Sequence, residues 1–166
     1  MPTTQNILLV TTATTTALMA GLFYAYSFSV NPGLNRLSDT AYVAAMQSIN
    51  RAILNPVFFA GFMGTALLLP LCTYSNYAQP LSMRFWFLLA ATVVYLIGVM
   101  GVTMAGNVPL NEALDAFNLS SASASEIAAQ RVAFEMPWNR LNTIRTIASI
   151  VAVIFTILAC LNSPDQ

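Results

Sequence analysis

The sequence contains four long apolar stretches, and these constrain the fold more than any other feature of the chain. The first, from Ile7 to Val30, is 24 residues without a charged side chain. A helix of this length rises about 1.5 Å per residue and so crosses the roughly 30 Å hydrocarbon layer of a bilayer. Three comparable stretches follow it. The pattern predicts four membrane-spanning helices, at about residues 7–30, 52–74, 85–106 and 143–161.

The composition supports an integral membrane protein. Hydrophobic residues make up 57% of the 166-residue chain and charged residues only 7%, whereas about a quarter of the residues in soluble domains are charged. The formal net charge is zero, which argues against a nucleic-acid partner because such proteins present a basic face. We therefore predict an all-α fold, an integral membrane four-helix bundle in a single domain of residues 1–166 that resides in the lipid bilayer.

The segments between the predicted spans also carry helix signals. Apolar residues recur at helical spacing over Asp39–Arg51, which predicts a helix in the connection between the first two spans. In the connection between the last two spans, one helix is expected to begin at Pro109. Ser123 or Ser125 is positioned to cap another that continues to Phe134. We expect these short helices to lie at the membrane interface.

The arginines gather on one side of the predicted bundle. Four spans place the connections 31–51 and 107–142 on one side of the membrane and the termini on the other. Because cytoplasmic loops are enriched in Lys and Arg, the charge bias predicts that these two connections are cytoplasmic. The opposite side carries only Arg84. The arginines on the first side are Arg36, Arg51, Arg131, Arg140 and Arg145.

Asparagine and arginine residues recur where the spans meet that same side. Three separate segments carry them: the start of the second span, the end of the third and the start of the fourth. A polar group at this depth needs a hydrogen-bond partner, since an unpaired one costs several kcal/mol. We therefore predict that the segments converge into one site. The candidate catalytic residues are Arg51, Arg145 and Asn142, and the candidate substrate-binding residues are Asn50, Asn55, Asn107, Asn111, Tyr24 and Trp138.

Each of these residues also has a purely structural interpretation. Arginines next to spans reach lipid head groups, and asparagines cap helices. Tyrosines such as Tyr24 and Tyr26 form the aromatic belt at the membrane interface. The site hypothesis therefore depends on the cluster as a whole and not on any single member.

The chain offers little for metal binding. It has no histidine, which is a usual ligand of zinc, haem and non-haem iron, and its carboxylates are few and scattered. Cys72 and Cys160 form neither a CxxC motif nor a metal-ligand cluster. We predict no metal site. The two cysteines end the second and fourth spans on one side, where they either pair or stay free.

Five motifs spread over nearly the whole chain carry a family resemblance. They are Gly21-Leu-Phe-Tyr24-Ala-Tyr-Ser27, Pro32-Gly-Leu, Ala45-Met-Gln-Ser-Ile-Asn50-Arg-Ala-Ile-Leu-Asn55-Pro56, Gly106-Asn-Val-Pro-Leu-Asn111 with Ala113-Leu114, and Trp138 to Thr146. In these motifs the chain resembles the small four-span proteins related to fungal anthrone oxygenases. One position departs from the family pattern, because Thr143 stands where histidine is common.

The resemblance implies the oxidation of an electron-rich polycyclic phenol, an anthrone, to a quinone by molecular oxygen without an evident cofactor. The substrate is then a hydrophobic small molecule that arrives from the bilayer. In this hypothesis Arg51 and Arg145 stabilise a substrate anion, and the asparagines orient the ring oxygens. The base stays open between Tyr24, Glu112 and Glu135.

Two other functions remain open at this point. The first is a non-enzymatic four-span protein whose arginine- and asparagine-rich end binds a protein partner or an anionic lipid head group. The second is a quinone-linked thiol oxidoreductase that uses Cys72 and Cys160, which the lack of a CxxC motif disfavours. The sequence also leaves open whether the chain forms a homo-oligomer.

Overall fold

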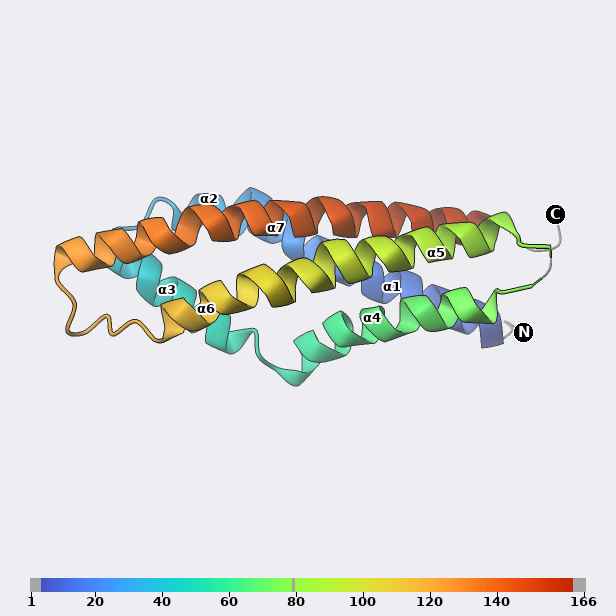
Figure 1. The fold of residues 1–166 in the computed structure, drawn as a ribbon, viewed down its shortest axis with the longest axis horizontal. Coiled ribbons are helices and arrows are strands. Elements are labelled where there is room, and N and C mark those ends of the chain that lie inside the picture. Colours follow the sequence, from blue (N-terminus) through green and yellow to red (C-terminus); the bar gives the residue numbers. More distant parts are fainter. Residues whose placement is uncertain (1–3, 79, 163–166) are drawn as a thin grey trace.

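The computed structural model describes residues 4–78 and 80–162, and every regular element among them is a helix (Figure 1). Four helical units are long and apolar enough to cross a membrane, which confirms the predicted all-α fold with four spans. The single-domain prediction for residues 1–166 includes positions 1–3, 79 and 163–166, which lie outside the described residues. The elements, with η for a π-helical turn, are α1 (Thr4–Ala25), η1 (Tyr26–Val30), α2 (Asn31–Leu34), α3 (Asp39–Ala52), α4 (Pro56–Ser75), α5 (Met83–Tyr95), η2 (Leu96–Gly101), η3 (Thr103–Asn107), α6 (Val108–Asp115) and α7 (Ala124–Leu161).

The long helices form an elongated bundle (Figure 1). Helix α7 packs along α1 and α5, and α4 packs against the same two helices. Gly98 permits one close approach, since a Cβ added there would lie 2.6 Å from the Cβ of Ala148. At the far end of the bundle, α3 and α6 pack against the first half of α7. The connections 31–51 and 107–123 thus lie at one end, and their cytoplasmic location stays a prediction.

The buried core has two main parts, which follow each other along the bundle axis. The part inside the four long helices is aliphatic and aromatic, and the part under α3 is rich in aromatic rings. The first part fills the four-helix bundle, and the second fills the adjoining layer formed by α3, α6 and the first half of α7. The first part comprises Met19, Phe23, Phe62, Ala66, Leu69, Ala91, Tyr95, Val99 and Ala152, and the second comprises Tyr42, Val43, Met46, Leu114, Ile127, Phe134 and Trp138.

The last span is much longer than the predicted range 143–161. Helix α7 begins at a capping box, in which Ser123 and Glu126 satisfy each other's backbone N–H groups, and continues for 38 residues through Pro137. The predicted helix that ends near Phe134 is therefore the first part of this same helix. The polar residues between Phe134 and Thr143 predicted a break in the helix. In the structure α7 is continuous there, and these residues lie where it leaves the most apolar part of the bundle.

The first and third spans are also longer than predicted, and π-helical turns explain how they pass proline. The N–H of Asn31 donates to the carbonyl of Tyr26, and the N–H of Val108 donates to that of Thr103, both five residues back. A proline ring clashes with the carbonyl four residues before it, and a widened turn moves that carbonyl aside. Pro32 and Pro109 directly follow these two turns, so each helix continues beyond its proline.

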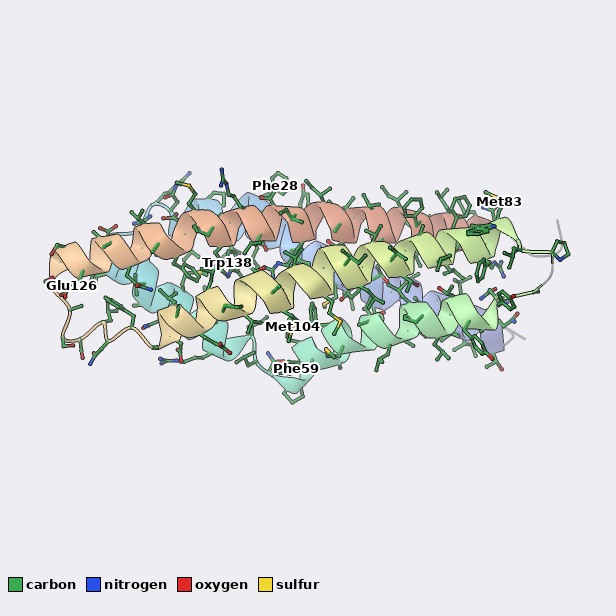
Figure 2. The ribbon with its side chains drawn as sticks, viewed as in Figure 1. Phe28, Phe59, Met83, Met104, Glu126 and Trp138 are labelled. Atoms are coloured by element: carbon green, nitrogen blue, oxygen red, sulfur yellow. The ribbon has the colours of Figure 1, made fainter. Side chains whose placement is uncertain are left out.

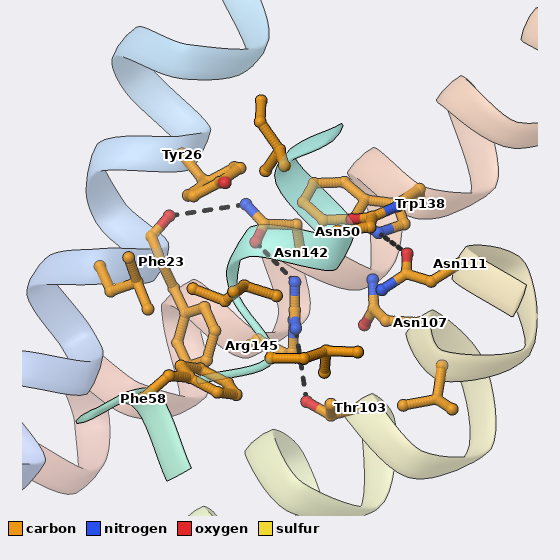
Figure 3. A pocket seen from close by; sticks show the side chains of 15 residues that line it. Phe23, Tyr26, Asn50, Phe58, Thr103, Asn107, Asn111, Trp138, Asn142 and Arg145 are labelled. Carbon is orange, nitrogen blue, oxygen red and sulfur yellow. Dashed lines mark hydrogen bonds between the residues drawn. The ribbon is translucent and has the colours of Figure 1, made fainter. Parts of the chain in front are cut away.

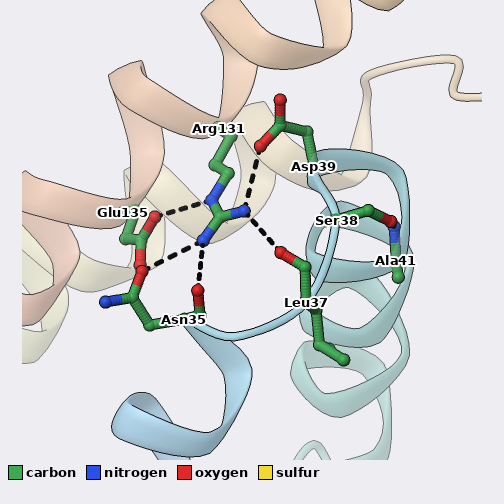
Figure 4. Close-up of polar contacts among 7 residues, drawn as sticks. All are labelled: Asn35, Leu37, Ser38, Asp39, Ala41, Arg131 and Glu135. Atoms are coloured by element: carbon green, nitrogen blue, oxygen red, sulfur yellow. Dashed lines mark hydrogen bonds and ion pairs between the residues drawn. The ribbon is translucent and has the colours of Figure 1, made fainter.

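Helix α3 confirms the helix that apolar spacing predicted over Asp39–Arg51, but its place at a membrane interface stays a prediction. Ser38 caps its N-terminus. An arginine on α7 fixes the segment before it: Arg131 bonds the side chains of Asp39 and Glu135 at 2.9 and 2.8 Å (Figure 4). The same guanidinium also bonds the backbone carbonyls of Leu37 and Asn35 and the side-chain oxygen of Asn35. The 35–39 segment is thereby tied to α7.

The arginine at the other end of the bundle has a structural role. Arg84 is buried, and its Nε donates to the carbonyl oxygens of Ala159 and Asn162 at 3.1 and 2.6 Å. These carbonyls belong to the last turn of α7 and to its C-cap, where the helix leaves acceptors without intrahelical partners. Arg84 therefore joins the start of α5 to the end of α7.

Candidate functional site

A cavity of about 90 Å³ lies where the four-helix part of the bundle meets the layer of α3 and α6. Its lining comes from α1, η1, α3, α4, η3, α6 and α7, so residues from distant parts of the sequence meet there (Figure 3). Six of the nine predicted site residues line it. They are Asn50, Asn107, Asn111, Trp138, Asn142 and Arg145.

Arg145 is the central polar residue of the cavity. Its side chain comes from α7, and the residue is only 6% exposed. One terminal nitrogen donates to Oδ1 of Asn142 at 2.9 Å, and the other donates to the hydroxyl of Thr103 at 3.4 Å. Asn142 in turn donates through Nδ2 to the hydroxyl of Ser27 at 2.9 Å. This chain of hydrogen bonds fixes the guanidinium against both η1 and η3.

Aromatic rings surround the guanidinium. The Cζ atom of Arg145 lies 4.6 Å from the ring centre of Phe23 and 5.4 Å from that of Trp138, distances at which a cation is attracted to the face of a ring. The indole Nε1 of Trp138 donates to Oδ1 of Asn111 at 2.8 Å. Figure 2 shows Trp138 between α7 and the helices that face it. Trp138 therefore forms a wall of the cavity whose orientation is set from α6.

Several buried polar atoms in the cavity have no hydrogen-bond partner in the described part of the chain. They are both amide atoms of Asn107, Nδ2 of Asn50 and Nε of Arg145. Asn107 is 1% exposed. Buried polar groups are nearly always paired, so these unpaired atoms on three side chains leave the cavity with free hydrogen-bonding capacity.

Charge in the cavity is unbalanced. Arg145 forms no ion pair among the described residues, and the lining contains no carboxylate. Of the candidate bases, Glu135 is held by Arg131, while Glu112 lines a separate surface depression beside Arg51. Neither enters the cavity. A buried cation without a counter-ion is costly, so the site favours an anion.

The structure does not bring Arg51 to Arg145. Arg51 forms an ion pair with Asp115 on the surface, and its side chain is 63% exposed. The physical reason is helical geometry, since Asn50 and Arg51 are neighbours on α3 and point about 100° apart. Only Asn50 faces the cavity. The predicted pairing of the two arginines across one site is therefore not found.

Two further predicted residues lie outside the cavity. Asn55 is the N-cap of α4, where its Oδ1 accepts hydrogen bonds from the N–H groups of Val57 and Phe58, both at 3.0 Å. Tyr24 is 52% exposed, and its ring packs on Phe28 with a centroid distance of 4.5 Å. Figure 2 shows Phe28 on the outside of the bundle. Tyr26, two residues later, lines the cavity instead.

The lining residues that sequence reasoning missed include Phe23, Phe58 and Thr103. A signal for Thr103 exists, because Thr103, Asn107 and Asn111 recur at four-residue spacing and so share a helix face. Phe23 and Phe58 carry no comparable signal, since apolar residues are expected throughout the spans. Tyr26, Thr103 and Asn107 all lie in π-helical turns, which are frequent at functional sites.

The cysteines take no part in this cavity. Cys72 is buried, Cys160 is exposed and both are free thiols. The described residues contain no group of three or more His, Cys, Asp or Glu side chains with the spacing of a metal site.

These features define a class: a helical protein with four membrane-length spans and a polar, aromatic-walled cavity inside the bundle. The sequence model of the anthrone oxygenase family matches residues 3–155, and the chain belongs to that family. The comparisons with curated proteins and with solved structures return no match. The family resemblance of the sequence motifs is thereby confirmed.

Proposed function

We propose that this protein is a membrane-embedded oxygenase for a hydrophobic aromatic small molecule of the anthrone or phenol type. The observation that carries the proposal is the cavity around Arg145, which combines aromatic walls with unpaired amide groups and a buried cation. Family membership supports the reaction class. Fold alone would not, since one fold hosts many activities.

The proposed reaction converts the methylene group of an anthrone into a carbonyl. Loss of a proton from the methylene carbon gives an electron-rich enolate, which reacts with molecular oxygen to form a carbon–oxygen bond. Cleavage of the oxygen–oxygen bond and loss of the second methylene hydrogen then give the quinone. One atom of the oxygen molecule ends in the new carbonyl and the other in water. Atoms and electrons balance without a cofactor.

The cavity residues have distinct roles in this proposal. Arg145 opposes the negative charge that develops on the substrate oxygen, and a preorganised charge of this kind acts most strongly where water is excluded. Asn142 holds the guanidinium in place, as its 2.9 Å bond supports. Asn50, Asn107 and Asn111 orient the oxygens on the substrate rings, while Phe23 and Trp138 form walls against those rings.

The proton leaves towards water on the side of α3 and α6. Asn50, Leu54 and Asn111 line both the cavity and the neighbouring surface depression that holds Glu112 and Asp115. The two hollows are therefore adjacent, and acidic side chains lie on the outer one. In the proposed mechanism, water in this outer hollow accepts the proton.

The substrate enters from the bilayer. Leu54 lines the cavity and is 64% exposed, so it lies where the cavity meets the surface. The apolar residues Val57 and Phe59 next to it are exposed as well, and Figure 2 shows Phe59 pointing away from the bundle. Since the cavity is smaller than the roughly 300 Å³ typical of pockets that enclose drug-sized ligands, only the oxygenated edge of a three-ring substrate fits inside.

The membrane orientation belongs to the same proposal. The connections 31–51 and 107–123 face the cytoplasm, as the arginine bias favours. Labelling of single cysteines introduced at the exposed positions Arg36 and Tyr77, in a background without Cys72 and Cys160, tests this with a membrane-impermeant thiol reagent. The opposite labelling pattern would reverse the assignment.

The activity is tested by incubating the purified full chain, in detergent micelles, with 1,8-dihydroxyanthrone and isotopically labelled oxygen gas. We expect quinone formation well above the protein-free rate, uptake of one oxygen molecule per quinone, and one labelled oxygen atom in the new carbonyl. The matched variants are Arg145→Met, which should lose the acceleration, and Arg140→Gln, which removes an exposed arginine of the same helix. A rate equal to that of empty micelles would refute the proposed function.

A further inference from the structure

We infer that the cavity binds its ligand as an anion, with one ionised oxygen at Nε of Arg145 and a neutral oxygen substituent beside it at Asn107. This deepens the proposed function by naming the substrate class: a planar aromatic compound with two adjacent oxygen substituents, one of which ionises on binding. It rests on that function only for the identity of the aromatic ligand. The charge and the hydrogen-bonding pattern come from the cavity itself.

The charge of the ligand follows from the protein side of the cavity. Arg145 is buried and has no carboxylate partner among the described residues. Tyr26 is the other titratable side chain in the lining, and a neutral phenol supplies no counter-charge. A buried cation needs an anion or a dense set of hydrogen bonds. A ligand that brings one negative charge completes the site.

The geometry favours a single anionic oxygen over a carboxylate or a phosphate. The two terminal nitrogens of Arg145 already donate to Asn142 and Thr103, and Nε is the nitrogen without a partner. Each terminal nitrogen carries two N–H groups, of which the protein engages one. An ionised carboxylate or phosphate only accepts hydrogen bonds, so it would leave Oδ1 of Asn107 without a donor. A phenolate or enolate oxygen with a hydroxyl beside it satisfies both residues and is the better match.

The second oxygen is inferred from Asn107. Both of its amide atoms lack partners, and it is almost fully buried. Figure 3 shows the side chains of Asn107 and Arg145 pointing into the same space. A hydroxyl can donate to Oδ1 of Asn107, and a carbonyl can accept from its Nδ2. An aromatic edge with an oxyanion next to a hydroxyl or carbonyl therefore satisfies both residues together.

The flat shape of the ligand follows from the walls. The rings of Phe23 and Trp138 lie against the guanidinium at 4.6 and 5.4 Å. A ligand oxygen that approaches Nε of Arg145 in the plane of the guanidinium therefore lies beside the rings of Phe23 and Trp138. A planar ring system stacks there, whereas a lipid head group is bulky in all directions.

The experiment uses 1,2-dihydroxyanthraquinone, a stable chromophore whose visible absorption changes when a hydroxyl ionises. The probe is added to the full chain in neutral detergent micelles, and its absorption is recorded as a function of pH. We expect the pH of half-ionisation of the bound probe to fall by about one unit or more relative to protein-free micelles, because an anion is stabilised about tenfold per unit. An unchanged value would overturn the inference.

Three variants and one control variant show which residues cause the shift. Arg145→Met should return the half-ionisation pH to that in empty micelles, and Arg145→Lys should retain part of the shift. Asn107→Asp changes one atom and supplies the missing negative charge, so it should abolish binding of the ionised probe. Arg140→Gln should behave like the unmodified protein. If Arg145→Met does not fold, the Lys and Asp variants still decide the question, and a full shift in Asn107→Asp would contradict the inference.

Matched ligands test the two-oxygen requirement and the source of the anion. We expect 2-hydroxyanthraquinone to bind about tenfold more weakly than the dihydroxy compound, with this difference lost in Asn107→Leu. Palmitate and phosphatidylglycerol should not displace the probe at equal concentration. Displacement by either would show a carboxylate or phosphate site instead and would overturn the assignment.

The binding assay and the turnover assay can give negative results independently of each other. Anthrone oxidation without any shift in probe ionisation would leave the proposed function intact and remove this inference. A shift without oxygen uptake would retain the anion site and remove the oxygenase. The two assays therefore distinguish between the statements.

Discussion

The indole nitrogen of Trp138 donates a 2.8 Å hydrogen bond to the side-chain oxygen of Asn111. The two residues lie on α7 and α6, and the bond joins two of the three polar segments that were expected to converge. The bond lies in a wall of the cavity. Trp138 contributes a buried ring to this wall, and Asn111 lines both the cavity and the outer hollow that contains Glu112. The relative position of α6 and α7 therefore affects the site directly.

Breaking this bond should weaken the junction between the two helices. We expect Trp138→Phe and Asn111→Leu each to destabilise the protein, and the double variant to be less destabilised than the sum by about 1 kcal/mol, the usual net value of such a bond. Thermal unfolding in detergent, followed by circular dichroism, measures the coupling. Strictly additive effects would mean that the bond contributes nothing.

Arg145 should contribute to binding at the expense of stability. Even a buried ion pair can often be replaced by apolar side chains with a change that is neutral or stabilising by about 1–4 kcal/mol, because burying charge is costly, and Arg145 has no ion pair to offset that cost. We therefore expect Arg145→Met to unfold at the same temperature or higher, while quinone formation falls about 100-fold or more. A strong loss of stability would instead make Arg145 a structural residue.

Arg51 distinguishes the two views of the site. If it acted on the substrate, as the sequence pattern suggested, Arg51→Gln would greatly lower the turnover rate. Its exposed ion pair with Asp115 predicts a small effect, with a stability change below about 1 kcal/mol and turnover close to that of the unmodified protein. Steady-state oxygen consumption with both proteins settles the choice.

Arg131 should be important for stability. Its guanidinium bonds Asp39, Glu135 and two backbone carbonyls of the 35–39 segment. Removing one member of such a partly buried network typically costs about 3 kcal/mol, so Arg131→Gln should unfold well below the unmodified protein. Arg140→Gln, on the exposed side of the same helix, is the control and should change stability little. Faster proteolysis within 35–39 would identify the released segment.

Tyr42 should make the protein sensitive to alkali. Burial and the neighbouring Glu135 raise its pKa above the ordinary value, and Arg131 offsets part of this rise. The unfolded chain then loses the phenol proton at lower pH than the folded chain, so stability is complete below about pH 10 and falls as pH increases above it. Tyr42→Phe should reduce this alkaline loss of stability. Identical profiles for the two proteins would contradict the prediction.

Much of the fold could be predicted from the sequence because hydrocarbon imposes a simple length rule on apolar segments. The four spans were found for this reason. Their true ends were not, since helices continue outside the hydrocarbon and nothing in residues 124–142 forces a break. Pro137 was compatible with either outcome. The helices at Pro32 and Pro109 continued because of π-helical turns, which local propensity does not indicate.

The candidate site was predicted in part for an equally specific reason. Polar residues at the ends of spans showed which segments would meet, but not which way each side chain would point. Asn50 and Arg51 are adjacent in the sequence, and Tyr24 and Tyr26 are two positions apart. In each pair only one residue, Asn50 or Tyr26, lines the cavity. Asn55 was a helix cap, an alternative that the sequence had left open.

The π-helical turn at Thr103–Asn107 has a consequence for how such a site arises. A turn of this kind holds one more residue than a regular helical turn, so it shifts the angular phase of everything that follows by about 100°. Deleting one residue there would leave the span intact in length and hydropathy, yet would rotate Asn111 away from Trp138. In this protein, a single additional residue in the turn therefore separates a plain membrane helix from one wall of the cavity.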